Sequence, residues 1–318
     1  MFPEDDANSG SRVAPEPESD RANFLGVAAM TGSMAAFVIN DVCVKLASQT
    51  LPIGEIITLR NVVATVVLFA LMGLASGIWG RLVWPRRIPY VLVGLRVGGE
   101  MVATILFLVA LVTLPLADLT AITQLAPLAL TAAAALLFGE YVGWRRWTAT
   151  AAGFLGVALI VRPGSAAFSL AGAMVLLSVA FVVVRDMATR LIARDVSSAF
   201  ISLTSSLSGI FAGFLLLPFE VWRVPSSSEA GLVFVSGFFL SIGFSLIVIA
   251  LRTGDISVVS PFRYSVILFA LIAGFVVWGE RPDFVALVGI VIICSAGLYT
   301  LHRERVRQRM QRASGPLP

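Results

Sequence analysis

Long apolar runs separated by short polar connections recur along almost the whole chain. A helix needs about 20 apolar residues to cross the hydrocarbon core of a bilayer, and these runs approach that length. We expect ten membrane-spanning helices near residues 23–47, 53–75, 89–113, 115–137, 145–162, 168–193, 197–217, 230–251, 254–279 and 281–301. The connections between them are too short to hold a soluble catalytic domain.

Composition supports the same class. Hydrophobic residues make up 58% of the 318 residues and charged residues only 13%, and the mean hydropathy is +0.92. These values lie far outside the usage of soluble globular domains. We therefore expect an all-α polytopic membrane protein, for which the lipid bilayer is the first partner.

The two halves of the chain share a spaced pattern. A single register without gaps aligns Gly139 with Gly279 and Glu140 with Glu280. Because five helices per half is an odd number, the second half should insert with the opposite orientation to the first. The sequence thus predicts a disordered acidic tail, two inverted five-helix repeats and a basic tail at residues 1–21, 22–162, 163–301 and 302–318.

Basic residues are distributed unevenly between the two predicted faces. Most of the 23 lysine and arginine residues fall on the face that carries both termini, including those of the tail after His302. Basic connections stay in the cytoplasm, so we expect both termini there, in the inner membrane of a bacterial cell. We interpret the basic tail as a topology anchor rather than a nucleic-acid site.

Ionisable residues inside the predicted spans are the main functional signal. A charge near the middle of a bilayer is costly, so it normally faces a partner or a water-filled cavity. The ninth predicted helix contains Pro261, which removes a backbone hydrogen-bond donor close to Arg263 and Tyr264. Arg96 and Glu100 stand one turn apart, which suits either solute contact or a structural pair. The candidate solute-binding residues are Arg96, Glu100, Gln124, Arg263 and Tyr264.

Further charged positions lie near helix ends. Asp41 and Lys45 are one turn apart on the first predicted helix, and Asp186 and Arg190 repeat this spacing on the sixth. Such residues form either gates at the two mouths of a pathway or local pairs that tether helix ends. The candidate gate or vestibule residues are Asn40, Asp41, Lys45, Arg185 and Asp186.

A third group is expected to be structural. Arg60 is too deep to reach the interface fully, so we expect it to pair with Asp41 or Glu55. The Gly-Glu pairs end matching helices in the two halves. The structural candidates are Arg60, Pro261, Gly139, Glu140, Gly279 and Glu280.

Several chemistries lack their usual residues. His302 is the only histidine, and Cys43 and Cys294 lie within apolar runs, so we expect no metal site, no disulfide and no cofactor. An intramembrane enzyme would lack a histidine within its spans. No GxxxxGK[ST] stretch is present, which argues against transport driven by ATP.

Motifs along nearly the whole chain carry a family resemblance. They are Lys45, Pro52, Arg60, Gly139-Glu140, Ser260-Pro261-Phe262-Arg263-Tyr264-Ser265 and Trp278-Gly279-Glu280-Arg281. With them the chain resembles the EamA-type branch of the drug/metabolite transporter superfamily. The resemblance implies ten helices in two inverted halves, a central cavity and movement of small metabolites without ATP hydrolysis. The Pro-Phe-Arg-Tyr segment is similar to that of members that include S-adenosylmethionine uptake carriers.

We therefore expect a secondary active transporter for a small polar organic solute. An amino acid or its derivative, such as an S-adenosylmethionine-like compound, is the first hypothesis, with protons as the candidate coupling ion. A riboflavin-type vitamin carrier or a drug or amine carrier is the alternative within the same fold. A membrane assembly or signalling partner is the alternative outside transport. The sequence indicates no nucleic-acid partner and no particular oligomeric state.

Overall fold

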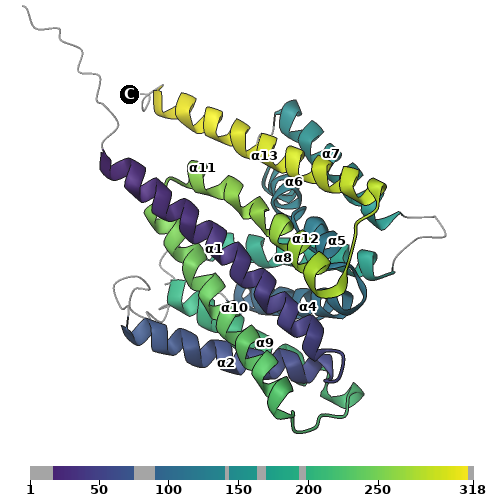
Figure 1. The fold of residues 1–318 in the computed structure, drawn as a ribbon. Helices are drawn as coiled ribbons and strands as arrows, with labels where there is room; N and C mark the ends of the chain where they lie inside the picture. Colours follow the sequence, from purple (N-terminus) through teal and green to yellow (C-terminus); the bar gives the residue numbers. More distant parts are fainter. Residues whose placement is uncertain (1–16, 75–89, 140–142, 163–169, 193–197, 314–318) are drawn as a thin grey trace, which may run out of the picture.

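The computed structural model describes residues 17–74, 90–139, 143–162, 170–192 and 198–313, and every element in these ranges is helical (Figure 1). Eight helical segments in these ranges are long and apolar enough to cross a membrane. The chain is therefore a polytopic membrane protein. Its first helix already begins at Pro17, within the predicted tail, whereas residues 1–16 and Glu140 lie outside the described residues.

Helices occur close to each predicted position. Those of the first half are α1 (Pro17–Ala47), α2 (Ile53–Leu74), α4 (Tyr90–Thr113), α5 (Leu116–Thr123), α6 (Ala126–Phe138) and α7 (Trp144–Val161). Those of the second half are α8 (Leu170–Leu191), α9 (Ser198–Phe214), α10 (Ser227–Thr253), α11 (Ile256–Val259), α12 (Ser265–Trp278) and α13 (Phe284–Ala313). Two 3-10 turns, η1 and η2, cover Leu217–Phe219 and Ser260–Tyr264. Helices α7 and α9 are not among the eight candidate spans.

Two predicted helices are interrupted rather than continuous. The segment at 115–137 contains α5 and α6, separated by a turn at Gln124 and Leu125. The segment at 254–279 contains α11, η2 and α12. Pro127 and Pro261 explain the interruptions, because a proline has no N–H and its ring clashes with the carbonyl of the preceding turn.

The two interrupted segments end in the same way. Gly139 after α6 has φ 64° and Gly279 after α12 has φ 67°, in the left-handed region that glycine adopts without a steric penalty. The Gly279 N–H donates to the Phe275 carbonyl at 2.9 Å, as in an αL C-cap, and the Glu280 N–H donates to the Gly274 carbonyl at 3.0 Å. Glycine at these two positions thus ends each helix sharply at a defined residue.

Helix contacts occur in pairs that correspond between the two halves. α1 packs along α10, just as α4 packs along α8, and α2 contacts α10 as α4 contacts α9. α1 contacts α12 as α6 contacts α8, while α2 packs on α9 and α7 on α13. Figure 1 shows α1 beside α10 and α13 beside α7. Exchanging the first five predicted spans with the last five reproduces this set of contacts.

The first interrupted segment lies in the core of the bundle, whereas α12 leaves much of its surface exposed. α5 packs against α12, and large side chains along α5 and the start of α6 are almost fully buried. We call the end of the bundle where α1 begins and α13 ends the terminal face (Figure 1). We call the opposite end, where α1 finishes, the Lys45 face.

Candidate functional site

A polar cavity of about 240 Å³ lies between α2, α4 and α8 at the two helix breaks. We call it the central cavity. Arg60, Gln124 and Ser178 are buried, and the other polar lining residues except Arg263 are partly buried. The polar and charged residues that line it are Arg60, Glu100, Thr104, Thr123, Gln124, Ser178, Arg185 and Arg263.

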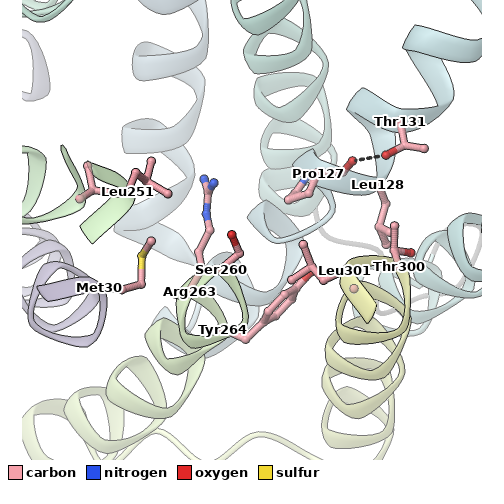
Figure 2. Close-up of a pocket in the computed structure, with 12 residues that line it drawn as sticks. Met30, Pro127, Leu128, Thr131, Leu251, Ser260, Arg263, Tyr264, Thr300 and Leu301 are labelled. Carbon is pink, nitrogen blue, oxygen red and sulfur yellow. Dashed lines mark hydrogen bonds between the residues drawn. The ribbon is translucent and has the colours of Figure 1, made fainter. Parts of the chain in front are cut away.

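A second cavity, of about 150 Å³, lies nearer the terminal face, and we call it the terminal-side pocket (Figure 2). Its lining is mainly apolar and includes Met30, Leu128, Leu251 and Leu301. Figure 2 shows the ring of Tyr264 reaching toward Leu301. A Cβ atom at Gly297 would overlap the Tyr264 hydroxyl, so a glycine on α13 makes room for this ring.

Arg263 borders both cavities. Its side chain is exposed although it lies in the middle of the bundle, whereas the neighbouring Tyr264 is buried. Figure 2 shows the two side chains leaving η2 in different directions. Since an arginine at this depth is costly unless it reaches water or a partner, the cavities account for its position. Arg263 therefore stands at the boundary between a polar and an apolar chamber.

Glu100 forms its ion pair with a residue of another helix. Arg185 Nη1 of α8 lies 3.2 Å from Glu100 Oε2, and Arg185 Nε donates to Asp186 Oδ1 at 2.8 Å. The predicted pairing of Arg96 with Glu100 therefore needs correction, although the two residues remain within electrostatic reach. Arg185, predicted at a gate or vestibule, lines the central cavity.

Arg96 is held by hydroxyl groups outside the lining of the central cavity. It donates to Thr189 Oγ1 at 2.5 Å and to Ser205 Oγ at 2.6 Å. Its side chain is buried between α4, α8 and α9. Among the predicted solute-binding residues, the central cavity brings together Glu100, Gln124 and Arg263 but not Arg96 or Tyr264.

A cluster of polar contacts at the Lys45 face joins three separate parts of the chain. Lys45 Nζ donates to Glu280 Oε1 at 2.7 Å and to the Leu114 carbonyl at 2.6 Å. Glu280 Oε2 accepts from the N–H of Leu116, the first residue of α5, at 2.8 Å. The Trp278 ring centroid lies 4.9 Å from the Lys45 ammonium, within cation–π range. These contacts tie α1, α5 and α12 together.

Lys45 consequently does not pair with Asp41, as its helical spacing had suggested. Asp41 accepts from Asn40 Nδ2 at 2.9 Å. Asn40 Oδ1 accepts from Ser236 Oγ at 2.7 Å and from Arg60 Nη1 at 3.4 Å. The predicted Arg60–Asp41 partnership thus acts through Asn40 and at longer range, since the two charges still influence each other.

Arg60 and Gln124 combine deep burial with missing partners. Arg60 is 6% exposed and Gln124 is 5% exposed. Among the residues that the structure describes, Arg60 Nε and Gln124 Nε2 have no hydrogen-bond partner. Both side chains line the central cavity. Sequence reasoning assigned Arg60 a structural role and missed its place at the cavity, because depth alone does not say which side of a helix faces a void.

Asp283 lies at the same face as the buried Lys45–Glu280 pair, but its carboxylate is exposed. Asp283 Oδ1 accepts from the Ala286 N–H at 2.8 Å and so caps α13, and Arg162 also bonds this carboxylate. The Ala286 amide and then Arg162 lower the pKa of Asp283. In the described part of the chain, no cluster of histidine, cysteine, aspartate and glutamate is arranged to hold a metal ion.

Comparison with known proteins places these features in a family. The sequence model of the EamA-like transporter family matches residues 24–162 and 166–301. An S-adenosylmethionine uptake transporter of Rickettsia prowazekii is 27% identical over 203 residues, which cover 60% of this chain and 65% of that protein. The chain therefore matches less than two thirds of the length of this relative.

Two further relatives are named for other solutes. A riboflavin transporter of Rhizobium johnstonii is 25% identical over 207 residues, 63% of this chain and 66% of that protein. The pseudopaline exporter CntI of Pseudomonas aeruginosa is 26% identical over 267 residues, 82% of this chain and 90% of that protein. A solved crystal structure shares the fold with a TM-score of 0.60 at 19% identity, covering 89% of this chain and 97% of that one.

Proposed function

Because this chain belongs to the EamA-like transporter family, we propose that it is a secondary active carrier that moves a small polar organic metabolite through the central cavity. The family and the names of the relatives indicate a small-molecule transporter rather than an enzyme. Because these relatives are named for different solutes, the candidate metabolites are amino acid derivatives, S-adenosylmethionine-like compounds and vitamins. We place the carrier in the inner membrane of a bacterium.

The exposure of Arg263 in the middle of the bundle carries this proposal. A residue of this kind inside a span is a functional-site hypothesis by default, because its insertion is expensive. Arg263 lies on a helix break that borders both cavities, and Gln124 lies on the other break. Interrupted helices that meet near the middle of the membrane are a recurring feature of solute sites in secondary transporters.

We further propose ten spans in two inverted five-helix repeats. The correspondence of helix contacts between the halves supports this arrangement, as do the left-handed glycines Gly139 and Gly279 at matching helix ends. Two adjacent matches to the family model, at residues 24–162 and 166–301, also support it. The terminal face would be cytoplasmic, since most basic residues fall on that side.

Glu100 is the proposed proton-coupling residue. It is a carboxylate of the central cavity, and its ion pair with Arg185 joins α4 to α8. Protonation of Glu100 would break its ion pair with Arg185. Proton binding would then be linked to a conformational change through this one contact. Since α4 and α8 belong to opposite halves of the chain, this contact can couple movement of the two halves.

Flux through purified protein in liposomes tests the carrier. We expect a radiolabelled member of a panel containing amino acids, S-adenosylmethionine and riboflavin to accumulate when a pH gradient is imposed. Accumulation should disappear in liposomes without protein and after the gradient is collapsed with a protonophore. Solute binding without any flux above the protein-free control would contradict the carrier and favour a membrane assembly or signalling role.

A further inference from the structure

The central cavity presents hydrogen-bond donors that lack acceptors. Arg60 Nε and Gln124 Nε2 are both donors, both buried to more than nine tenths, and both without a partner among the described residues. Buried polar groups are normally hydrogen-bonded, so a buried donor facing a cavity is completed by water or by a ligand. These two buried donors therefore have no acceptor among the described residues.

The ionisable residues that line the central cavity are mainly cationic. Its described ionisable residues are three arginines and one glutamate, and Glu100 is already bound by Arg185. Arg263 forms no ion pair with any described residue, and Asp186 acts on it only at longer range. The cavity therefore offers two cations, Arg60 and Arg263, whose charge is not neutralised by a carboxylate in its lining.

The terminal-side pocket supplies a different environment next to Arg263. Its lining includes Leu128, Leu251, Leu301 and the buried ring of Tyr264, and its exposed surface is predominantly apolar. Since Arg263 borders both spaces, a ligand held by its guanidinium can extend from the polar chamber into the apolar one. A solute with a charged head and an apolar body fits a polar chamber followed by an apolar one.

We propose that the solute carries an anionic group, bound by Arg60, Gln124 and Arg263, and an apolar or aromatic body that occupies the terminal-side pocket. A carboxylate satisfies several donors at once, and hydrogen bonds between two charged groups are stronger than neutral ones. This inference rests on the proposed function and narrows it, because it disfavours a solute with net positive charge. Arg60 then determines specificity rather than only stabilising the bundle.

Four small probes, three of them matched in shape, test the inference on purified protein in detergent. They are 3-phenylpropionate, its amide 3-phenylpropionamide, 3-phenylpropylamine and propionate, with binding measured by calorimetry. We expect 3-phenylpropionate to bind about tenfold or more tightly than the amide and the amine, because only it pairs with the arginines. Propionate should also bind weakly, because it lacks the apolar body.

Substitutions at the cavity identify the residues responsible. Arg60→Gln should weaken binding of 3-phenylpropionate by about tenfold and leave the amide unaffected. Gln124→Leu buries no new polar group and should also weaken binding of the carboxylate. It replaces the Arg60→Gln test if that variant fails to fold. Arg252→Gln removes a charge from an exposed position on α10 and serves as the matched control. Unchanged carboxylate binding by both cavity variants would overturn the inference.

The outcomes separate this inference from the carrier itself. Tighter binding of 3-phenylpropylamine than of 3-phenylpropionate, or no binding of any probe, would overturn the inference. The proposed function would survive that result if liposomes still moved S-adenosylmethionine or another cation. Selective binding of the carboxylate without flux of any solute would support the site and contradict the carrier.

Discussion

Arg263→Ala should reduce solute flux by about two orders of magnitude while leaving the chain folded. Arg263 is exposed at the boundary of two cavities, so its removal neither opens a hole in a packed core nor breaks an ion pair with a described residue. It does remove the charge that we place on the solute's path, and 100-fold corresponds to about 2.7 kcal/mol. Initial flux rates in liposomes, at equal amounts of reconstituted protein, measure the effect.

Two controls make this result specific. Arg252→Ala removes an exposed arginine of α10 that lines neither cavity, and should leave flux unchanged. Arg263→Lys keeps the charge but loses the planar fork, and should retain part of the activity. Full flux by Arg263→Ala, with thermal stability equal to that of the unmodified chain, would show that the pathway does not pass this residue.

Glu280→Ala should lower the free energy of unfolding by about 3 kcal/mol. Breaking a buried ion pair by removing one partner typically costs 3–5 kcal/mol, and the lower value applies because the Glu280 side chain is 18% exposed. The change strands the Lys45 ammonium and leaves the Leu116 N–H without its acceptor. Apparent melting temperature in a fixed detergent measures the loss.

Asp283→Ala provides the matched comparison at the same face. Asp283 is also a carboxylate at a helix N-terminus, but it is exposed, so we expect a loss of only about 1 kcal/mol. The double variant Lys45→Met/Glu280→Leu should recover much of the stability, because it leaves no buried charge alone. Equal effects of Glu280→Ala and Asp283→Ala would contradict a special role for the buried pair.

Much of the fold follows from patterns that are local in the sequence. Apolar runs of bilayer length predict where the helices lie, because each spanning helix satisfies its own backbone hydrogen bonds. Glycine before glutamate predicts helix ends at Gly139 and Gly279, since left-handed backbone favours glycine. Pro261 predicts a disturbed helix in the same way, although the extent of the break depends on the packing around it.

The partners of the buried charges could not be predicted in this way. Spacing by one turn favoured Arg96 with Glu100, yet Glu100 reaches Arg185 on another helix. The same reasoning favoured Asp41 for Lys45, which instead reaches Glu280 far along the chain. Intrahelical pairs contribute only about 0.2–0.5 kcal/mol each, so contacts between packed helices override them. Where Arg60 points is decided by that packing as well.

Water access to the central cavity is the most direct test of the account. Thr104 lines the cavity on α4, whereas Leu268 is an exposed apolar residue on the surface of α12. After Cys43 and Cys294 are replaced by alanine, Thr104→Cys and Leu268→Cys are treated with a charged, membrane-impermeant thiol reagent in permeabilised membranes. The account predicts rapid modification at position 104 and none at position 268, because only the first meets water. Resistance of position 104 would contradict an aqueous pathway at the two helix breaks.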